Sequence, residues 1–467
     1  MNNLFYSYLI LTLLFKYGSI AKAEDNLYLS GEQVCNNTVA QRGLEKGNYV
    51  AVPLNDKQTD HQLDQTQQTT PIYYWTLDEF RAERPSLIYF VGGPGGSAHQ
   101  FQIDLPDWNI IYFDQRGTAC SQFSTEEQAL NGSLYSSEII ARDAEQIRQH
   151  LGIQQWSVYG HSYGTVPATI YAHLFPSSTK ALVLEGTVSS GTSDLWNAPR
   201  RLKILQSFYD HLPIELKKVV QSISAGTGNE LTFSQIAFSF FYLDDSLKLI
   251  LNYLNDMKAI LPASPSDGAE AKLDIPGTAL ENLGSSPNSY AAITCRELSG
   301  MSADSNFYYQ FVNEKFTINR SSSDQSARHE RCQTFGLSPD NSLVKTYQAS
   351  DYPVTVPTTY FQGTTDGATT ANQAVHHFKK VAQGPKQMLL KINGGHSPNI
   401  GLISKNLTDS APEETSPNSA QIKTTQQKIF ALALSGQQIP QSLIESINQL
   451  SDLKWVKTQK NLKPTNP

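Results

Sequence analysis

The sequence has no cluster of lysine or arginine and is poor in charge overall. Only 17% of its 467 residues are Asp, Glu, Lys or Arg, and 43 acidic residues outnumber 36 basic ones, which gives a formal net charge of −7. Binding to nucleic acid needs a positive field over the phosphates, so no nucleic-acid partner is expected. Disorder is excluded too, because aromatic residues alone make up 10% of the chain. The chain is expected to fold into a mildly acidic globular protein.

The first residues also lack a hydrophobic run long enough to span a membrane. The largely apolar run 4–15 is short of the roughly 18 to 20 residues of a spanning helix. Ala21-Lys22-Ala23 follows, with small residues at both cleavage positions. This pattern predicts a signal peptide over 1–23, export to the periplasm or outside the cell, and no stable membrane insertion after cleavage. An uncleaved anchor or a buried helix is the alternative, because no Lys or Arg precedes the run.

Cysteine is scarce as well. None of the four cysteines forms a Cys-x-x-Cys pair, so no metal and no cofactor is expected. In an exported chain the four can form two disulfides, with three possible pairings. We favour one bond within the segment 295–332 and the other between the two remaining cysteines, with buried free thiols as the alternative. The favoured pairs are Cys295 with Cys332 and Cys35 with Cys120.

What the sequence does have is an alternation of apolar runs and helical patterns, typical of a mainly parallel sheet with crossover helices. Between about 194 and 348 helical segments such as 201–212 and 233–257 dominate, so this stretch is predicted to be an inserted lobe. Predicted strands are 48–54, 71–77, 86–91, 108–113, 155–159, 180–184, 354–362 and 387–392. Predicted helices of the flanking parts are 136–151, 165–175, 372–382 and 420–434.

A nucleophile motif lies between the strand 155–159 and the following helix. In Gly160-x-Ser162-x-Gly164, the glycines relieve the crowding of a sharp turn that presents the serine hydroxyl above the sheet. A bare motif of this kind is usually an ordinary turn serine. Here the partners that a nucleophilic serine needs follow in chain order.

A serine hydroxyl needs a histidine to take its proton and a carboxylate to orient that histidine. Asp366 follows the strand 354–362, and His396 follows the strand 387–392. The order Ser, Asp, His is the order expected of α/β-hydrolases. A turn aspartate and a solvated loop histidine are the alternatives, and Glu185 is a rival acid. We therefore predict a triad of Ser162, Asp366 and His396.

An attacked carbonyl oxygen must also be stabilised by two fixed N–H groups. The backbone N–H of Tyr163, directly after the nucleophile, is the first candidate, and that of Gly93 in the glycine loop 92–96 is the second. The alternatives for this loop are a plain turn or a phosphate loop without its lysine. His161, the neighbour of Ser162, is expected to pack against the site.

Together these motifs resemble those of the α/β-hydrolases of the prolyl aminopeptidase and tripeptidyl aminopeptidase branch. The resemblance implies an α/β-hydrolase fold, with a mostly parallel central sheet flanked by helices and an inserted, mainly helical cap. The implied division is a core over 24–195 and 346–467, with a cap over 196–345. The motifs that carry the resemblance are Gly92-Gly93-Pro94-Gly95-Gly96, Asp114-Gln115-Arg116-Gly117, residues 160–165, Asp366 and Gly395-His396.

The resemblance also implies cleavage at peptide amino termini. Val91, His161 and Tyr163 depart from the residues usual in prolyl aminopeptidases, whereas residues 162–165 and 293–297 look more like the tripeptidyl branch. An exopeptidase must bind a free ammonium group, and a carboxylate in the cap is the natural partner. Glu297 is the candidate, with a purely structural glutamate as the alternative. Asp114 and Arg116 are expected to brace the loops.

The sequence thus predicts a secreted serine aminopeptidase that acts on a peptide or small acyl substrate through an acyl-enzyme. The same machinery cleaves esters more easily than amides, so a carboxylesterase or lipase-like enzyme is the second hypothesis. A catalytically silent binding protein on the same fold is the third.

Overall fold

The structure is a computed structural model of the chain. It describes residues 35–36, 47–55, 68–191, 208–225, 242–260, 286–298, 332–338, 342–396, 402–404, 418–452 and 454–458. The predicted signal peptide, 1–23, lies outside the described residues. None of the described helices combines the length and apolarity needed to cross a bilayer.

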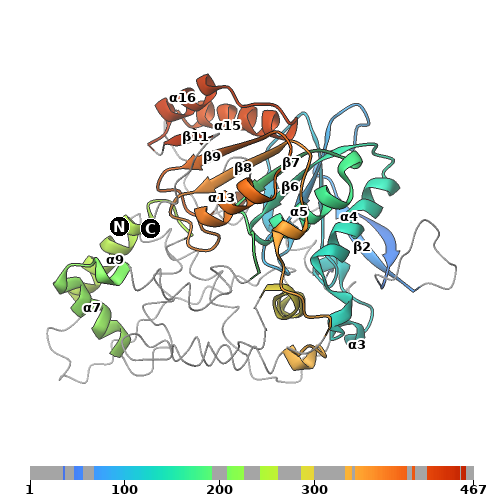
Figure 1. Cartoon of the computed structure of the whole chain (residues 1–467), viewed down its shortest axis with the longest axis horizontal. Helices are drawn as coiled ribbons and strands as arrows, with labels where there is room; N and C mark the ends of the chain where they lie inside the picture. Colours follow the sequence, from blue (N-terminus) through green and yellow to red (C-terminus); the bar gives the residue numbers. More distant parts are fainter. Residues whose placement is uncertain are drawn as a thin grey trace.

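A nine-stranded sheet forms the centre of the protein (Figure 1). From β5 to β9 in spatial order, neighbouring strands are parallel. Strands β1, β2 and β11 pair antiparallel at the two edges. The predicted mostly parallel sheet is therefore confirmed. In spatial order the strands are β1 (Asn48–Pro53), β2 (Thr69–Trp75), β5 (Asn109–Phe113), β3 (Ser86–Phe90), β6 (Trp156–His161), β7 (Thr179–Glu185), β8 (Thr358–Gly363), β9 (Lys386–Lys391) and β11 (Trp455–Thr458).

Helices cover both faces of this sheet (Figure 1). On one face lie α4 (Ser137–His150), α5 (Thr165–Leu174) and α13 (Ala371–Lys380), and on the other α15 (Ser419–Leu434) and α16 (Gln441–Leu450). Successive side chains of a strand point to opposite faces. In β3, Ile88 and Phe90 accordingly join the first core, and Leu87 and Tyr89 join the second. A strand that is buried on both faces has one continuous apolar run in its sequence, and residues 86–91 form such a run.

The shorter elements lie in the connections. Strands β4 (Phe101–Ile103) and β10 (Leu402–Ser404) form a separate antiparallel pair. The short helices are η1 (Ala98–Gln100), η2 (Ala119–Ser121), α3 (Glu126–Ala129), η3 (Gly132–Leu134), η4 (Ser162–Gly164), η5 (Pro176–Ser178) and η9 (Ala349–Asp351).

Within the predicted cap, 196–345, the described elements are helical. They are α7 (Ile214–Ala225), α9 (Ser246–Ile260), α10 (Pro287–Ile293) and the π-helical turn η7 (Thr294–Leu298). Helices α7 and α9 lie side by side (Figure 1) and share a small apolar core of their own. The limits of the cap and of the two core segments stay a prediction.

Two predicted elements include described residues that lie outside a strand or helix in the structure. The strand predicted from 354 begins at Thr358, because Val354 makes only an isolated bridge to Ala382 and Pro357 has no N–H to donate. Of the helix predicted over 233–257, residues 233–241 lie outside the described residues, 242–245 form a turn, and α9 begins at Ser246. Asp245 just before it has a φ of +51°, a left-handed conformation that a helix cannot contain.

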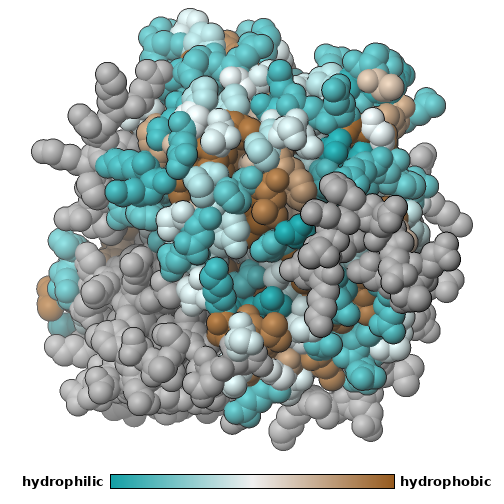
Figure 2. Space-filling view, turned by 45° about the vertical axis from the view of Figure 1, so that its right-hand side comes forward, coloured by the Kyte–Doolittle hydropathy of each residue, from teal (hydrophilic) through white to brown (hydrophobic). Residues whose placement is uncertain are grey.

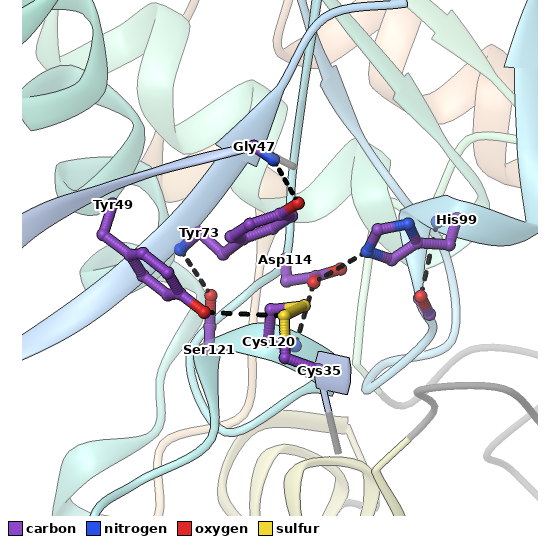
Figure 3. The surroundings of a disulfide bond; sticks show 9 residues. Cys35, Gly47, Tyr49, Tyr73, His99, Asp114, Cys120 and Ser121 are labelled. Atoms are coloured by element: carbon purple, nitrogen blue, oxygen red, sulfur yellow. Dashed lines mark hydrogen bonds and ion pairs between the residues drawn. A yellow bond between two sulfur atoms is a disulfide. The ribbon is translucent and has the colours of Figure 1, made fainter. Parts of the chain in front are cut away.

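All four cysteines form disulfides, in the pairing that we favour: Cys35 with Cys120 and Cys295 with Cys332. The first bond ties the segment before β1 to η2 beneath the sheet edge (Figure 3). The second lies within the predicted cap.

The described surface is mostly hydrophilic on the face shown in Figure 2, with hydrophobic residues in small, separate patches. Scattered exposed apolar side chains are normal for a globular protein. The large ones among the described residues are Tyr49, Ile214, Leu247, Ile392 and Val456.

Candidate active site

The candidate residues gather at the carboxyl-terminal ends of the parallel strands. These ends lie on the same side of the sheet, because neighbouring strands run in the same direction. Ser162 follows β6, Asp366 follows β8 and His396 follows β9. The glycine loop 92–96 follows β3, the neighbour of β6. Ligands of open α/β sheets bind outside the carboxyl ends of the strands.

Ser162 occupies a sharp turn between β6 and α5. Its φ of +56° lies in the left-handed region, which is uncommon for a residue with a side chain. A Cβ at Gly160 would lie 2.5 Å from the Gly164 carbonyl oxygen, and one at Gly164 would collide with the Phe90 carbonyl oxygen. The two glycines of the motif are thus required by close backbone approach.

Three buried side chains form one hydrogen-bonded chain. The Nε2 atom of His396 lies 2.8 Å from the Ser162 hydroxyl oxygen. The Nδ1 atom of the same ring lies 3.0 and 3.1 Å from the two carboxylate oxygens of Asp366. With the Nδ1 proton donated to Asp366, Nε2 is left to accept the serine proton. The structure therefore brings together the residues of the predicted triad.

Asp366 is itself fixed by its own turn. One oxygen accepts the backbone N–H groups of Ala368 and Thr369, both at 2.8 Å, and the other accepts the Thr369 hydroxyl at 2.8 Å. The side-chain amide of Gln362 donates at 3.1 Å. These bonds compensate the burial of the carboxylate and hold it toward His396. Sequence analysis did not predict that Thr369 binds Asp366. The available signal was the aspartate, since aspartate side chains often accept backbone N–H groups of the turn that follows them.

The rival acid has a different partner. Glu185, at the end of β7, accepts a hydrogen bond from the Tyr159 hydroxyl at 2.6 Å. Asp366 is the carboxylate that His396 contacts.

His161 packs against the site. Its ring centroid lies 5.3 Å from that of His396. Burial lowers the pKa of His161 to about 3, and the neighbouring His396 acts in the same direction, so His161 is neutral at physiological pH.

The glycine loop lies against the nucleophile. A Cβ at Gly92 would stand 2.9 Å from the Ser162 Cβ, and Gly93 has a φ of +122° that favours glycine. The amide of Gln115 donates to the Val91 carbonyl at 3.1 Å and fixes the start of the loop. The oxyanion role of the Gly93 and Tyr163 N–H groups stays a prediction.

The loop after β5 braces the fold. The Arg116 guanidinium donates to both carboxylate oxygens of Asp143, at 2.8 and 2.5 Å, and to the Leu54 carbonyl at 3.0 Å. Asp114 contacts the Nε2 atom of His99 at 3.1 Å and accepts the Cys120 backbone N–H at 3.1 Å.

One group in the described part of the chain has metal-ligand geometry. The ligand atoms of His99, Asp114 and Cys120 all lie within 4.8 Å of one another (Figure 3). A cysteine binds metal as a thiolate, whereas the Cys120 sulfur is bonded to Cys35. The disulfide-bonded protein therefore offers only two ligands there.

Glu297 lies where the predicted cap meets the core. Its carboxylate accepts the backbone N–H of Ser137 at 3.0 Å and the Ser137 hydroxyl, and that hydroxyl also contacts the Tyr163 hydroxyl at 2.9 Å. Burial raises the pKa of Glu297, which the bonds from Ser137 partly oppose. The carboxylate thus stabilises the first turn of α4, close to the side chain that follows Ser162. Its role toward substrate stays a prediction.

Comparison with known proteins agrees with this architecture. A family model described as "alpha/beta hydrolase fold" matches residues 85–401. A proline iminopeptidase of Lactobacillus helveticus is 31% identical over 163 residues, which cover 34% of this chain and 51% of that protein. A putative hydrolase of Escherichia coli is 31% identical over 179 residues, covering 30% of this chain and 36% of that protein. The chain thus spans about half or less of the length of these relatives.

Among solved structures, a proline iminopeptidase of Mycobacterium smegmatis superposes with a TM-score of 0.41 and 13% identity, over 82% of this chain and 99% of that one. The family model covers more than half of the chain. The protein is therefore a member of the alpha/beta hydrolase fold family.

Proposed function

We propose that this protein is an exported serine aminopeptidase that releases a residue or a short peptide from peptide amino termini. The observation that carries the proposal is the buried chain from Ser162 through His396 to Asp366, with bonds of 2.8 and 3.0 Å. This is the arrangement that turns a serine hydroxyl into a nucleophile.

In the proposed mechanism Ser162 attacks the carbonyl carbon while His396 takes the hydroxyl proton at Nε2. Asp366 orients the ring and stabilises its positive charge. The N–H groups of Tyr163 and Gly93 hold the oxyanion, and loss of one such donor typically costs about 10² to 10³ in kcat. His396 then returns the proton to the leaving amine, and water hydrolyses the acyl-enzyme by the same route.

The choice of a peptidase rests on the relatives and on Glu297. The relative from Lactobacillus helveticus is a proline iminopeptidase. A free ammonium group that enters the site needs an anionic partner. A carboxylate has about four lone-pair sites, so the bonds from Ser137 leave Glu297 able to accept more.

Export is supported by the two disulfides, because such bonds persist in oxidising compartments.

A cleavage profile tests the substrate class. We expect peptide amides with a free amino terminus to be hydrolysed, and the same peptides with an acetylated terminus to resist, because acetylation removes the ammonium charge. The measurement is a substrate library with free and blocked termini, run beside short acyl esters. Faster hydrolysis of blocked peptides or plain acyl esters would favour the carboxylesterase instead, and no turnover with any substrate would favour a binding protein.

Replacement of Glu297 by glutamine tests the ammonium site. The amide keeps an oxygen for the Ser137 N–H but loses the charge, so KM for free-terminus peptides should rise about tenfold, the effect of roughly one charge-assisted hydrogen bond. KM for acyl esters should stay unchanged. The matched control is Glu138→Gln, which removes a charge from the neighbouring surface position on α4, where Glu138 pairs with Arg142. Equal KM values for Glu297→Gln and wild type on free-terminus peptides would assign Glu297 a structural role only.

A further inference from the structure

The loop that carries His396 is held by a short segment of the predicted cap, residues 242–245. One oxygen of the Asp244 carboxylate accepts the Gly395 backbone N–H at 2.9 Å, and the other contacts the Lys391 ammonium at 2.7 Å. Lys391 ends β9 and Gly395 directly precedes His396. A single carboxylate thus connects the last residue of β9 with the neighbour of the histidine.

Two backbone bonds extend the same contact. The His396 N–H donates to the Tyr242 carbonyl at 3.0 Å, and the Asp245 N–H donates to the Asn393 carbonyl at 2.8 Å. The Tyr242 ring also packs edge-on against the His396 ring, with centroids 4.8 Å apart. A Cβ at Gly395 would lie 2.5 Å from the Leu243 carbonyl carbon, so the approach requires glycine there.

The loop after β8 also holds this loop, since the Gly394 carbonyl accepts the Thr365 N–H at 3.0 Å, but the residues of the loop itself favour mobility. It contains two consecutive glycines, Gly394 and Gly395, and Asn393 in the left-handed region with a φ of +57°. His396 must nevertheless keep Nε2 on Ser162 and Nδ1 on Asp366, both within hydrogen-bond distance. A displacement of about 1 Å in such a site costs around 10²-fold in rate.

We propose that Asp244 is a positioning residue for the reaction, which holds His396 in its productive place through Gly395 and Lys391. The inference rests on the proposed function and deepens it, because the predicted cap then helps to complete the catalytic geometry. Asp244 is partly exposed, with 32% of its side chain accessible, while Lys391 is 10% accessible. The pair is therefore shielded enough for the charge-assisted bonds to be directional.

Asp244→Ala and Asp244→Asn test the role, with Asp245→Asn as the matched control. Alanine removes both bonds, so kcat should fall about 10- to 100-fold, with KM within about threefold of wild type. Asparagine keeps an acceptor for the Gly395 N–H and loses the ion pair, so its kcat should lie between those of Asp244→Ala and wild type. Asp245→Asn removes the same charge one residue later and suits the left-handed φ of +51°, so it should behave as wild type.

A second readout separates positioning from substrate binding and from folding. The rate at which a fluorophosphonate labels Ser162 reports the Ser–His pair without a peptide. It should fall with Asp244→Ala by the same factor as kcat, with both rates measured on folded protein well below the melting temperature of the variant. Wild-type labelling rates in Asp244→Ala, a change confined to KM, or a kcat loss accounted for by unfolded protein would overturn the inference and leave the proposed function standing. Absence of labelling at Ser162 in the wild-type protein would overturn both.

Discussion

Replacement of Ser162 by alanine is expected to abolish hydrolysis of every substrate. The hydroxyl is the only group that is exchanged, and its oxygen lies 2.8 Å from His396 Nε2. In serine hydrolases with a triad, loss of the nucleophile lowers kcat by roughly 10⁶-fold. Combining the change with His396→Ala should cost little more, because the two residues act as one unit.

The fold should survive this change. Serine and alanine both carry a Cβ, so the strain of the left-handed φ at residue 162 is the same before and after. Circular dichroism and the melting temperature measure this directly, beside initial rates on peptides and esters. The control is Ser157→Ala, a buried serine of β6, the strand before Ser162, whose hydroxyl donates to the Leu434 carbonyl at 2.6 Å. It should keep full activity. Turnover by Ser162→Ala, or covalent labelling of that variant by a fluorophosphonate, would show that another residue is the nucleophile.

The central sheet and the three residues of the chain Ser162–His396–Asp366 could be predicted because their signals are local. Continuous apolar runs mark strands buried on both faces, and Gly160-x-Ser162-x-Gly164 marks the turn after one of them. Parallel strands then place Asp366 and His396 at the same edge as Ser162, although His396 is 234 positions away in sequence.

The contacts between the predicted cap and the core could not be predicted in the same way. Asp244 lies 151 positions from Gly395, and Glu297 lies 160 positions from Ser137. No local pattern couples such positions, and the helical pattern around 233–257 concealed the turn at 242–245. The sequence does not predict strand β11 for a related reason. Its four residues lie at the outer side of the sheet and acquire their strand conformation from pairing with β9.

Replacement of Arg116 by methionine is expected to destabilise the protein by about 3 to 5 kcal/mol, the cost of removing one partner of a buried ion pair. The guanidinium is 1% exposed and Asp143 is 3% exposed. Methionine fills much of the volume but leaves the Asp143 carboxylate buried without its cation, and leaves the Leu54 carbonyl without its donor. The measurement is the free energy of unfolding in guanidinium chloride, with fluorophosphonate labelling of the folded fraction as a test of the site.

Two matched variants test whether this loss comes from burial of the charge. Arg142→Met removes an arginine whose pair with Glu138 is 41% and 35% exposed, and an exposed pair of this kind contributes about 0 to 1 kcal/mol. The double change Arg116→Met with Asp143→Leu removes both charges. It should recover part of the stability, because apolar groups of similar volume often replace a buried pair without loss.

Labelling of Ser162 in folded Arg116→Met should proceed at the wild-type rate, since Arg116 stabilises the loop after β5 and the end of β1. If Arg116→Met is as stable as wild type, Arg116 does not have the proposed stabilising role. If the variant keeps normal stability but loses activity, Arg116 acts in the substrate site.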